Sequence, residues 1–308
     1  MDLVTATDPT DKYYCPSFVS IQTFNLNSHI TNNSTLSIIH TESNYCRVYY
    51  YEVSNNIFLL EDNRLNNWKF TLKKQALHLP TQLLSLDRIM GGGIPKANLT
   101  LIYGEANTGK SSLALQCAVI SAKHNLKTII IDSDNNFSPN RLSQIANYNL
   151  NHISPLIFIF KPQSFNEQSL LIEHLDDYIS NDVILIIVDT ITSHYRLELG
   201  QIDKIFSLNR DLNRQIAYLA NIAKTHNIAV LLISQVRDVF KNGKQQVEPV
   251  ANRILKFWAQ TILSSRMTKN RAIREVLIEK PSITKNVDAR CLFMINKTGI
   301  IDLDIQTP

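Results

Sequence analysis

The sequence predicts an α/β fold in which helices cover both faces of a mostly parallel sheet, preceded by a small β-rich region. Three observations lead to this fold class. From about residue 81, apolar runs of strand length alternate with helical segments. The runs are apolar almost without interruption, as expected of parallel strands that are buried on both faces. A glycine-containing loop connects one of the first runs to a helix, an arrangement found in many α/β folds.

The expected elements alternate along the chain. A short helix over residues 83–90 ends at three consecutive glycines. Strands are expected at 99–103, 128–132, 156–160, 183–189 and 228–234. Helices are expected between them, at 110–124, 140–147, 165–180 and 207–225. After Val250 a helical piece precedes β runs at 260–267, 274–279 and 291–296, which we expect to add antiparallel strands to one sheet edge.

Residues 1–78 differ in composition from residues 79–308, so we expect two parts. The first part is rich in Asn, Ser, Thr and Tyr and contains no Gly. Short β-like runs recur in it at 18–24, 36–41, 47–53 and 57–60, which predicts a small β-rich region of unassigned role. The tyrosines at 49–51 fit either a plain strand or a stacking platform for bases.

Composition excludes several classes of protein. No apolar run approaches the roughly 18 residues of a membrane span, and the N-terminus lacks the basic start and apolar core of an export signal. We therefore expect a cytoplasmic protein without a membrane partner. The four cysteines lie far apart without a C-x-x-C pair, so neither a zinc site nor a disulfide framework is indicated.

Positive charge is concentrated in the last third of the chain. Between Val236 and Thr298 there are 13 Lys and Arg against 5 Asp and Glu, a formal charge of +8, which leaves −4 for the rest. Such asymmetry indicates an anionic partner. Charge alone leaves a solvated basic face as the alternative.

Residues 104–111 read G-E-A-N-T-G-K-S, which matches the phosphate-binding P-loop pattern G-x-x-x-x-G-K-[ST]. A strand precedes the loop and a helix follows it, so the phosphates would meet free amides at a helix N-terminus. Lys110 would reach the β- and γ-phosphates, and the Ser111 hydroxyl would bind Mg²⁺. The predicted nucleotide contacts are Gly104, Glu105, Ala106, Asn107, Thr108, Gly109, Lys110, Ser111 and Ser112.

Polar side chains follow three other predicted strands. Asp189 ends the apolar run that starts at Val183, where a P-loop ATPase needs a second acid beside the metal. Asp132 and Asp134 follow the strand after the P-loop helix, and one of them can orient the attacking water. Gln235 follows a further strand and fits either a γ-phosphate sensor or a solvated strand end.

Four motifs resemble, in order, those of RecA/RadA-type recombinases. Residues 79–94 (LPTQLLSLDRIMGGGI) are similar to the family's S-L-D…G-G-G-I segment, and 131–141 (IDSDNNFSPNR) to I-D-T-E-G-x-F-x-P-E-R. Residues 188–196 (VDTITSHYR) resemble V-D-S-x-T-x-x-Y-R, and 233–236 (ISQV) resemble x-N-Q-V. The resemblance covers about three quarters of the chain. It is greatest to archaeal RadB, the shortened recombinase paralogue, through Y-R-L-E at 195–198 and the short segment 235–249.

The resemblance implies a RecA-like P-loop core that uses ATP and Mg²⁺, with Lys110, Asp134 and Gln235 as the catalytic set and Ser111 and Asp189 as the metal ligands. It places Arg141 near the adenine and gives Gln235 the coupling of nucleotide state to DNA contact. Asp134 stands where the family has a catalytic glutamate. Its carboxylate would fall short of the water by about 1.5 Å, and a misplacement of that size can cost about 100-fold in rate. The resemblance therefore implies a weak DNA-dependent ATPase in which slow hydrolysis to ADP and phosphate acts as a switch.

Two segments match the family's DNA-contacting loops. Arg196 belongs to the first, and the second contains Arg237, Phe240, Lys241 and Lys244, which suit phosphate neutralisation and base stacking. The resemblance thus implies a role in DNA recombination and repair with single-stranded DNA as the favoured partner, together with a full-length recombinase or another repair protein. The family's F-x-x-A docking motif has no match around residues 68–73, so filament formation is not expected.

Two other functions stay open. A KaiC-like signalling ATPase or kinase would have protein partners, but such proteins often carry paired glutamates where this chain has Asp132 and Asp134. A non-hydrolysing mediator would bind the nucleotide only to hold its shape while it contacts a full recombinase.

Overall fold

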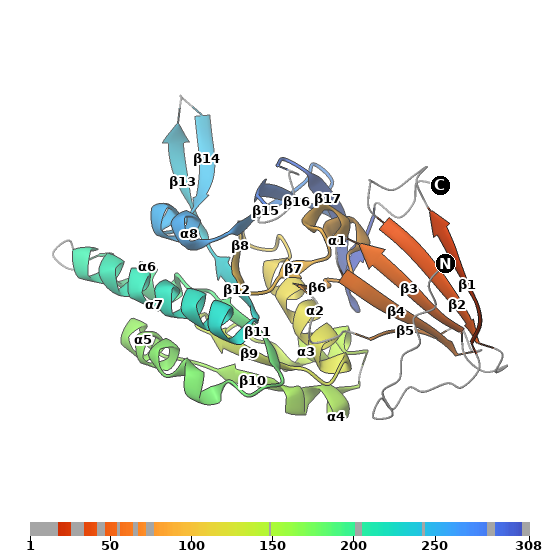
Figure 1. Cartoon of the computed structure of the whole chain (residues 1–308). Helices are drawn as coiled ribbons and strands as arrows, with labels where there is room; N and C mark the ends of the chain where they lie inside the picture. The colour runs from red at the N-terminus through yellow and green to blue at the C-terminus, as the bar shows by residue number, and fades with distance from the viewer. Residues whose placement is uncertain are drawn as a thin grey trace. The chain divides into compact units, whose positions relative to one another are not determined.

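A computed structural model describes residues 18–25, 34–41, 47–53, 56–63, 67–71, 77–147, 149–200, 205–241, 244–281 and 287–303 (Figure 1). In the strands before residue 72 and at residues 241 and 244–246, the description concerns the backbone alone. The chain divides into two compact units, Met1–Ala76 and Leu77–Pro308.

The first unit contains a five-stranded antiparallel meander. Its strands follow one another in the sheet: β1 (Phe18–Asn25), β2 (Ser34–Thr41), β3 (Arg47–Val53), β4 (Asn56–Asn63) and β5 (Asn67–Thr71). The first four fall on the predicted β runs, and β5 was not predicted. Tyr50 lies in the central strand, opposite Ser37 on one side and Leu59 on the other. Cys15 and Cys46 lie outside the described residues.

The second unit is built on a nine-stranded sheet with the order β10-β9-β11-β12-β8-β15-β16-β17-β18. Its strands are β8 (Asn98–Gly104), β9 (Lys127–Asp132), β10 (Ile157–Phe160), β11 (Val183–Asp189), β12 (Ala229–Ser234), β15 (Thr261–Met267), β16 (Ile273–Lys280), β17 (Arg290–Asn296) and β18 (Gly299–Asp302). The strands from β10 to β15 are parallel, and the remaining three are antiparallel. The predicted mostly parallel sheet is therefore confirmed.

One detail of the predicted sheet was wrong. The strand at 260–267 was expected to be antiparallel, but β15 runs parallel to β8, with Ile262 opposite Leu101. The helix α8 (Asn252–Trp258) carries the chain back to the edge at which the parallel strands begin. The next strand, β15, can therefore run in the same direction as β8. Antiparallel pairing begins only at β16.

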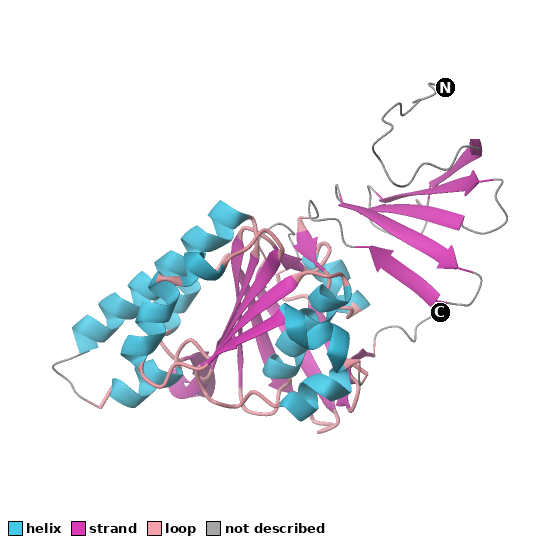
Figure 2. Cartoon of the chain, turned by 90° about the horizontal axis from the view of Figure 1, so that it is seen from below, coloured by secondary structure: helices cyan, strands magenta, loops and turns pink. Residues whose placement is uncertain are grey.

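Helices cover both faces of this sheet, as Figure 2 shows. They are α1 (Leu84–Met90), α2 (Lys110–Lys123), α3 (Pro139–Ile145), α4 (Leu150–Ile153), α5 (Phe165–Glu173), α6 (Ser193–Glu198), α7 (Ile205–His226) and α8, with 3₁₀ turns at Ser154–Leu156 and Leu175–Tyr178. The helix expected over 165–180 ends at Glu173. A 3₁₀ turn follows it, which buries Leu175 and leaves Asp176 and Asp177 exposed. None of the described helices combines the length and apolar character needed to cross a membrane.

The core lies on both sides of the central strands. Alternate side chains of β8, Leu99, Leu101 and Tyr103, join one buried cluster with α5 and α7. The long helix α7 buries residues at helical spacing on its inner face: Leu208, Leu212, Ile216, Leu219 and Ile222. On the opposite face α2 contacts β8, β9, β11 and β12 and is buried along most of its length.

The glycine segment before the core forms a tight turn. Gly91 ends α1 in the left-handed region with φ 77°, and Gly93 has φ 115°. A side chain on Gly93 would overlap the backbone of Leu79 in the two-residue strand β6 (His78–Leu79), which pairs with β7 (Ile94–Pro95). Close approach of the two backbones therefore requires glycine here.

The Asp87 side chain of α1 binds the segment that follows β6. Its carboxylate accepts hydrogen bonds from the Thr81 amide at 2.9 Å and the Thr81 hydroxyl at 2.7 Å. Burial raises the pKa of Asp87 to about 7 from 3.8, although the bonds from Thr81 lower it. The folded chain therefore binds more protons than the unfolded chain between about pH 4 and pH 7.

We expect the pH dependence of stability to change in Asp87→Asn. In the native protein, the contribution of Asp87 to the free energy of unfolding falls as pH rises through that window and levels off above about pH 7. Asn keeps an acceptor for Thr81 but does not titrate. The stability of the variant relative to the native protein should therefore rise by up to about 3 kcal/mol from pH 5 to pH 8. Urea unfolding across this pH range measures it. Parallel pH curves for the variant and the native protein, with exposed Asp177→Asn as the control, would contradict this account.

Candidate functional site

Four neighbouring parallel strands end at one edge of the sheet and carry most of the predicted site residues. In the register, Asp189 of β11 lies opposite Asp132 of β9 and opposite Ile233 of β12. Ser234 at the end of β12 lies opposite Tyr103, directly before the P-loop. Ligands of open α/β sheets bind at this carboxyl edge.

Hydrogen bonds within the P-loop and between the P-loop and β15 hold the conformation of the loop. The Glu105 carbonyl accepts hydrogen bonds from Lys110 Nζ at 2.6 Å and from the Thr108 hydroxyl at 2.9 Å. The Ser265 hydroxyl donates to the Thr108 carbonyl at 2.8 Å. Gly109, with φ 98°, precedes α2, and no side chain caps the amides of the first turn of this helix. These amides can therefore bind an anion.

The charged groups beside the loop affect one another. Burial lowers the pKa of Lys110, while Asp189, Asp134 and Glu105 raise it. Burial raises the pKa of Asp189 to about 6, and the charges of Asp134 and Asp132 raise it further, whereas a hydrogen bond from Ser111 and the charge of Lys110 lower it. A cation bound here would relieve the repulsion among the three aspartates.

The donor chemistry fits Mg²⁺. Mg²⁺ takes oxygen ligands and is usually held by one or two protein groups, with waters and phosphates completing its shell. The Ser111 hydroxyl and the Asp189 carboxylate supply such oxygens. Among the described residues, the buried hydroxyls of Ser133 and Thr190, which follow Asp132 and Asp189, have no hydrogen-bond partner in the protein. No described group of three or more His, Cys, Asp or Glu residues could hold a metal by itself.

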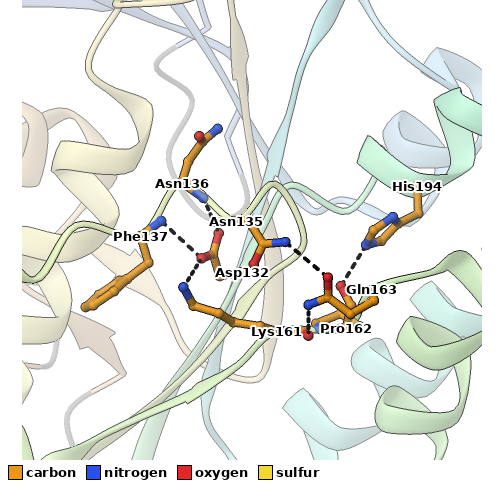
Figure 3. A network of polar contacts seen from close by, with 8 residues as sticks. All are labelled: Asp132, Asn135, Asn136, Phe137, Lys161, Pro162, Gln163 and His194. Carbon is orange, nitrogen blue, oxygen red and sulfur yellow. Dashed lines mark hydrogen bonds and ion pairs between the residues drawn. The ribbon is translucent and has the colours of Figure 1, made fainter.

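Asp132 shapes the loop that carries Asp134 (Figure 3). It is buried, and its two oxygens accept hydrogen bonds from the amides of Asn136 and Phe137, each at 3.0 Å. Lys161 Nζ lies 3.5 Å from the same carboxylate. Asp132 therefore acts as a structural residue. Sequence reasoning missed Lys161, although it follows β10 at the same sheet edge.

Asp134, Gln235 and Arg196 form a hydrogen-bonded chain, to which we refer as the relay. Gln235 Nε2 donates to Asp134 Oδ2 at 3.1 Å and to Oδ1 at 3.3 Å. Arg196 Nη1 donates to Gln235 Oε1 at 3.0 Å. The structure thus connects the predicted catalytic acid with the first predicted DNA-contacting segment through one glutamine side chain.

Arg141 holds a turn of the antiparallel part of the sheet. Its guanidinium donates to the carbonyls of Asn296 at 2.7 Å and Lys297 at 3.0 Å, between β17 and β18. Burial lowers its pKa. A side chain on Gly109 would contact Phe293 of β17, so the strand held by Arg141 also borders the P-loop. The position of Arg141 near an adenine stays a prediction.

The second predicted DNA segment is a hairpin and not an irregular loop. The strands β13 (Val236–Lys241) and β14 (Lys244–Pro249) pair antiparallel, and the hairpin projects from the core beside α8 in Figure 1. Arg237 is exposed, and Phe240 is 80% exposed. Lys241 and Lys244 are opposite one another in the register, and their side chains lie outside the described residues. Asn242 and Gly243 between two β-prone runs are the hairpin signal that was missed.

A family model described as Rad51 matches residues 72–303. The chain belongs to the Rad51 family. Within this family it is a RadB-like recombinase paralogue, so the predicted resemblance is confirmed. The first 71 residues lie outside the family match.

Several relatives of this Rad51-family chain match it over nearly their whole length. The "DNA repair and recombination protein RadB" of Methanosphaera stadtmanae is 31% identical over 74% of this chain and 97% of that protein. The protein of the same name from Thermococcus kodakarensis is 32% identical over 73% of this chain and 100% of its own length. A solved structure, "Crystal structure of the RadB recombinase", has a TM-score of 0.63 at 32% identity and covers 73% of this chain and 99% of that one.

Gly104→Ala should destabilise the second unit, because the added methyl group would overlap the carbonyl of Ser265. Overpacking of this kind costs about 1–3 kcal/mol. The free energy of unfolding, measured with urea, should fall by that amount. Gly200→Ala is the matched control, since nothing lies within 4 Å of the added methyl group there. Equal stability of the two variants would contradict the close contact between the P-loop and β15.

Proposed function

We propose that this chain is an ATP- and DNA-binding recombinase paralogue that acts in homologous recombination and DNA repair, with slow Mg²⁺-dependent ATP hydrolysis as a switch. The observation that carries the proposal is the relay, which joins the carboxylate beside the P-loop to an exposed arginine through Gln235. The relatives named as DNA repair and recombination proteins support the biological role.

In this proposal the P-loop residues from Gly104 to Ser112 hold the ATP phosphates. The amides of the first turn of α2 bind phosphate oxygens, and Lys110 leaves the Glu105 carbonyl to reach the β- and γ-phosphates. Ser111 and Asp189 hold Mg²⁺, which neutralises charge on the phosphates when bound. Arg141 borders the adenine.

Asp134 orients the attacking water, and Gln235 contacts the γ-phosphate. Both oxygens of Asp134 already accept hydrogen bonds from Gln235, and its side chain is one methylene shorter than glutamate. Slow turnover follows from both features. Because Gln235 already occupies both oxygens of Asp134, a second candidate function is also favoured. In it the chain is a mediator that binds ATP without hydrolysing it and works by contact with a full-length recombinase. The Rad51-family match favours both candidates over a KaiC-like signalling ATPase.

DNA contacts come from the α6 segment and the hairpin. Arg196 and Arg237 are exposed and can neutralise phosphates, as can Lys241 and Lys244. Phe240 can stack on an unpaired base, which favours single-stranded DNA. Burial raises the pKa of Tyr195 and the charge of Arg237 lowers it, so α6 and the hairpin base lie within electrostatic reach of each other.

The proposed coupling is tested by DNA binding at several salt concentrations, with and without ATP and Mg²⁺. We expect the affinity for a single-stranded oligonucleotide to fall steeply with salt and to rise at least fivefold with ATP and Mg²⁺. In Lys110→Ala the affinity should no longer respond to ATP, because the variant loses the phosphate contact. An unchanged ATP affinity in Lys110→Ala, or DNA binding that ignores ATP in the native protein, would refute the proposal.

Asp134→Glu should raise the rate of hydrolysis by up to about 100-fold, because the longer side chain places its carboxylate nearer the water. Phosphate release in the presence of saturating single-stranded DNA measures the rate. Asp177→Glu, on an exposed 3₁₀ turn, is the matched control. A native rate of many turnovers per second, or no gain in Asp134→Glu, would show that the shorter side chain does not limit turnover.

A further inference from the structure

We propose that Arg196 is a positioning residue that restrains the catalytic loop until DNA binds. Its guanidinium holds Gln235, and Gln235 in turn holds both oxygens of Asp134. A DNA phosphate that takes over Arg196 releases Gln235 and frees Asp134 to act on the water. This inference rests on the proposed function and adds an order of events to it.

The carboxamide of Gln235 suits this position because it offers an acceptor at one end and two donors at the other. Its oxygen accepts from the Arg196 cation at 3.0 Å, and its nitrogen donates to the Asp134 carboxylate at 3.1 and 3.3 Å. Both bonds have one charged partner and are therefore stronger than bonds between neutral groups. A change at Arg196 thus reaches Asp134 through a single side chain.

The segments that carry Arg196 and Asp134 are held by other contacts, so only the side chains of the relay need to move. Two contacts hold α6 in place. In the first, His194 Nε2 lies 2.9 Å from the Pro162 carbonyl (Figure 3). In the second contact, the Tyr195 hydroxyl donates a hydrogen bond to the Asn209 side chain of α7 at 2.8 Å. At the other end, Asp132 and Lys161 fix the loop of Asp134.

The segment at 161–163 contacts residues that neighbour both ends of the relay. Lys161 binds Asp132, the Pro162 carbonyl binds His194, and Gln163 accepts a hydrogen bond from Asn135 at 3.5 Å. The backbone of Gln235 is held as well, since its carbonyl accepts from the Val250 amide at 3.0 Å and the Ser234 hydroxyl at 2.9 Å. DNA can therefore act on the relay without moving the backbone.

Arg196 can exchange its partner because its side chain is exposed. Gln235 offers it one neutral oxygen, whereas a DNA phosphate offers two oxygens that share a negative charge, in the geometry that a guanidinium binds best. The exchange is therefore favourable. Once released, the Gln235 amide can turn from Asp134 toward a γ-phosphate.

Arg196→Met removes the donor while keeping a side chain of similar length. Without DNA, we expect this variant to hydrolyse ATP about three to ten times faster than the native protein, because Gln235 is released. Added DNA should stimulate it less. Arg196→Lys retains a cation and should keep the slow DNA-free rate. Arg210→Met is the matched control, since Arg210 lies exposed on α7 and pairs only with neighbouring Asp211 among the described residues.

The opposite outcome would identify Arg196 as a DNA contact alone. In that case the DNA-free rate of Arg196→Met would equal the native rate, and a higher DNA concentration would restore the full stimulated rate. This result would overturn the inference and leave the proposed function standing.

A second readout needs neither ATP nor hydrolysis. The side-chain amide of Gln235 can be observed by ¹⁵N NMR and assigned by its loss in Gln235→Glu. We expect a single-stranded oligonucleotide to shift this resonance in the native protein, and Arg196→Met to shift it in the same direction without DNA. DNA binding that leaves the resonance in place would overturn the relay alone, whereas an absence of DNA binding would refute the proposed function as well.

Discussion

The parallel register of β9, β11, β12 and β8 is the constraint on which the site depends. Because parallel strands end at the same edge, residues separated by more than a hundred positions become neighbours there. Asp189 lies opposite Asp132, and Ser234 lies opposite Tyr103. The sheet therefore brings the P-loop, Asp189, the loop of Asp134 and Gln235 to one edge.

Electrostatics give this edge its specific character. Burial raises the pKa of Asp189, and the charges of Asp134 and Asp132 raise it further, whereas Ser111 and Lys110 oppose the shift only in part. Asp132 pairs with Lys161 and accepts hydrogen bonds from two backbone amides, which hold the loop structure. Asp134 is held by Gln235, and Asp189 by Ser111. The three acids thus differ in their partners, although all three lie at the same edge of the sheet.

Local patterns were enough to predict the central sheet, the P-loop and the position of Asp189. Long apolar runs and a motif with a fixed spacing carry these signals within a few residues. Features that depend on distant contacts were missed. The carbonyls that bind Arg141 lie about 155 residues away, and the parallel direction of β15 depends on how α8 returns the chain. The hairpin was missed for a different reason, because Asn242 and Gly243 did carry a local signal for it.

If nucleotide and DNA act on one another through this shared edge, as we propose, their binding is thermodynamically linked. If ATP strengthens DNA binding by a given factor, DNA must strengthen nucleotide binding by the same factor. Calorimetric titration of a non-hydrolysable ATP analogue with Mg²⁺, with and without saturating single-stranded DNA, measures this factor. We expect the nucleotide to bind at least fivefold more tightly when DNA is bound. Equal nucleotide affinities, with DNA shown to be bound, would contradict it.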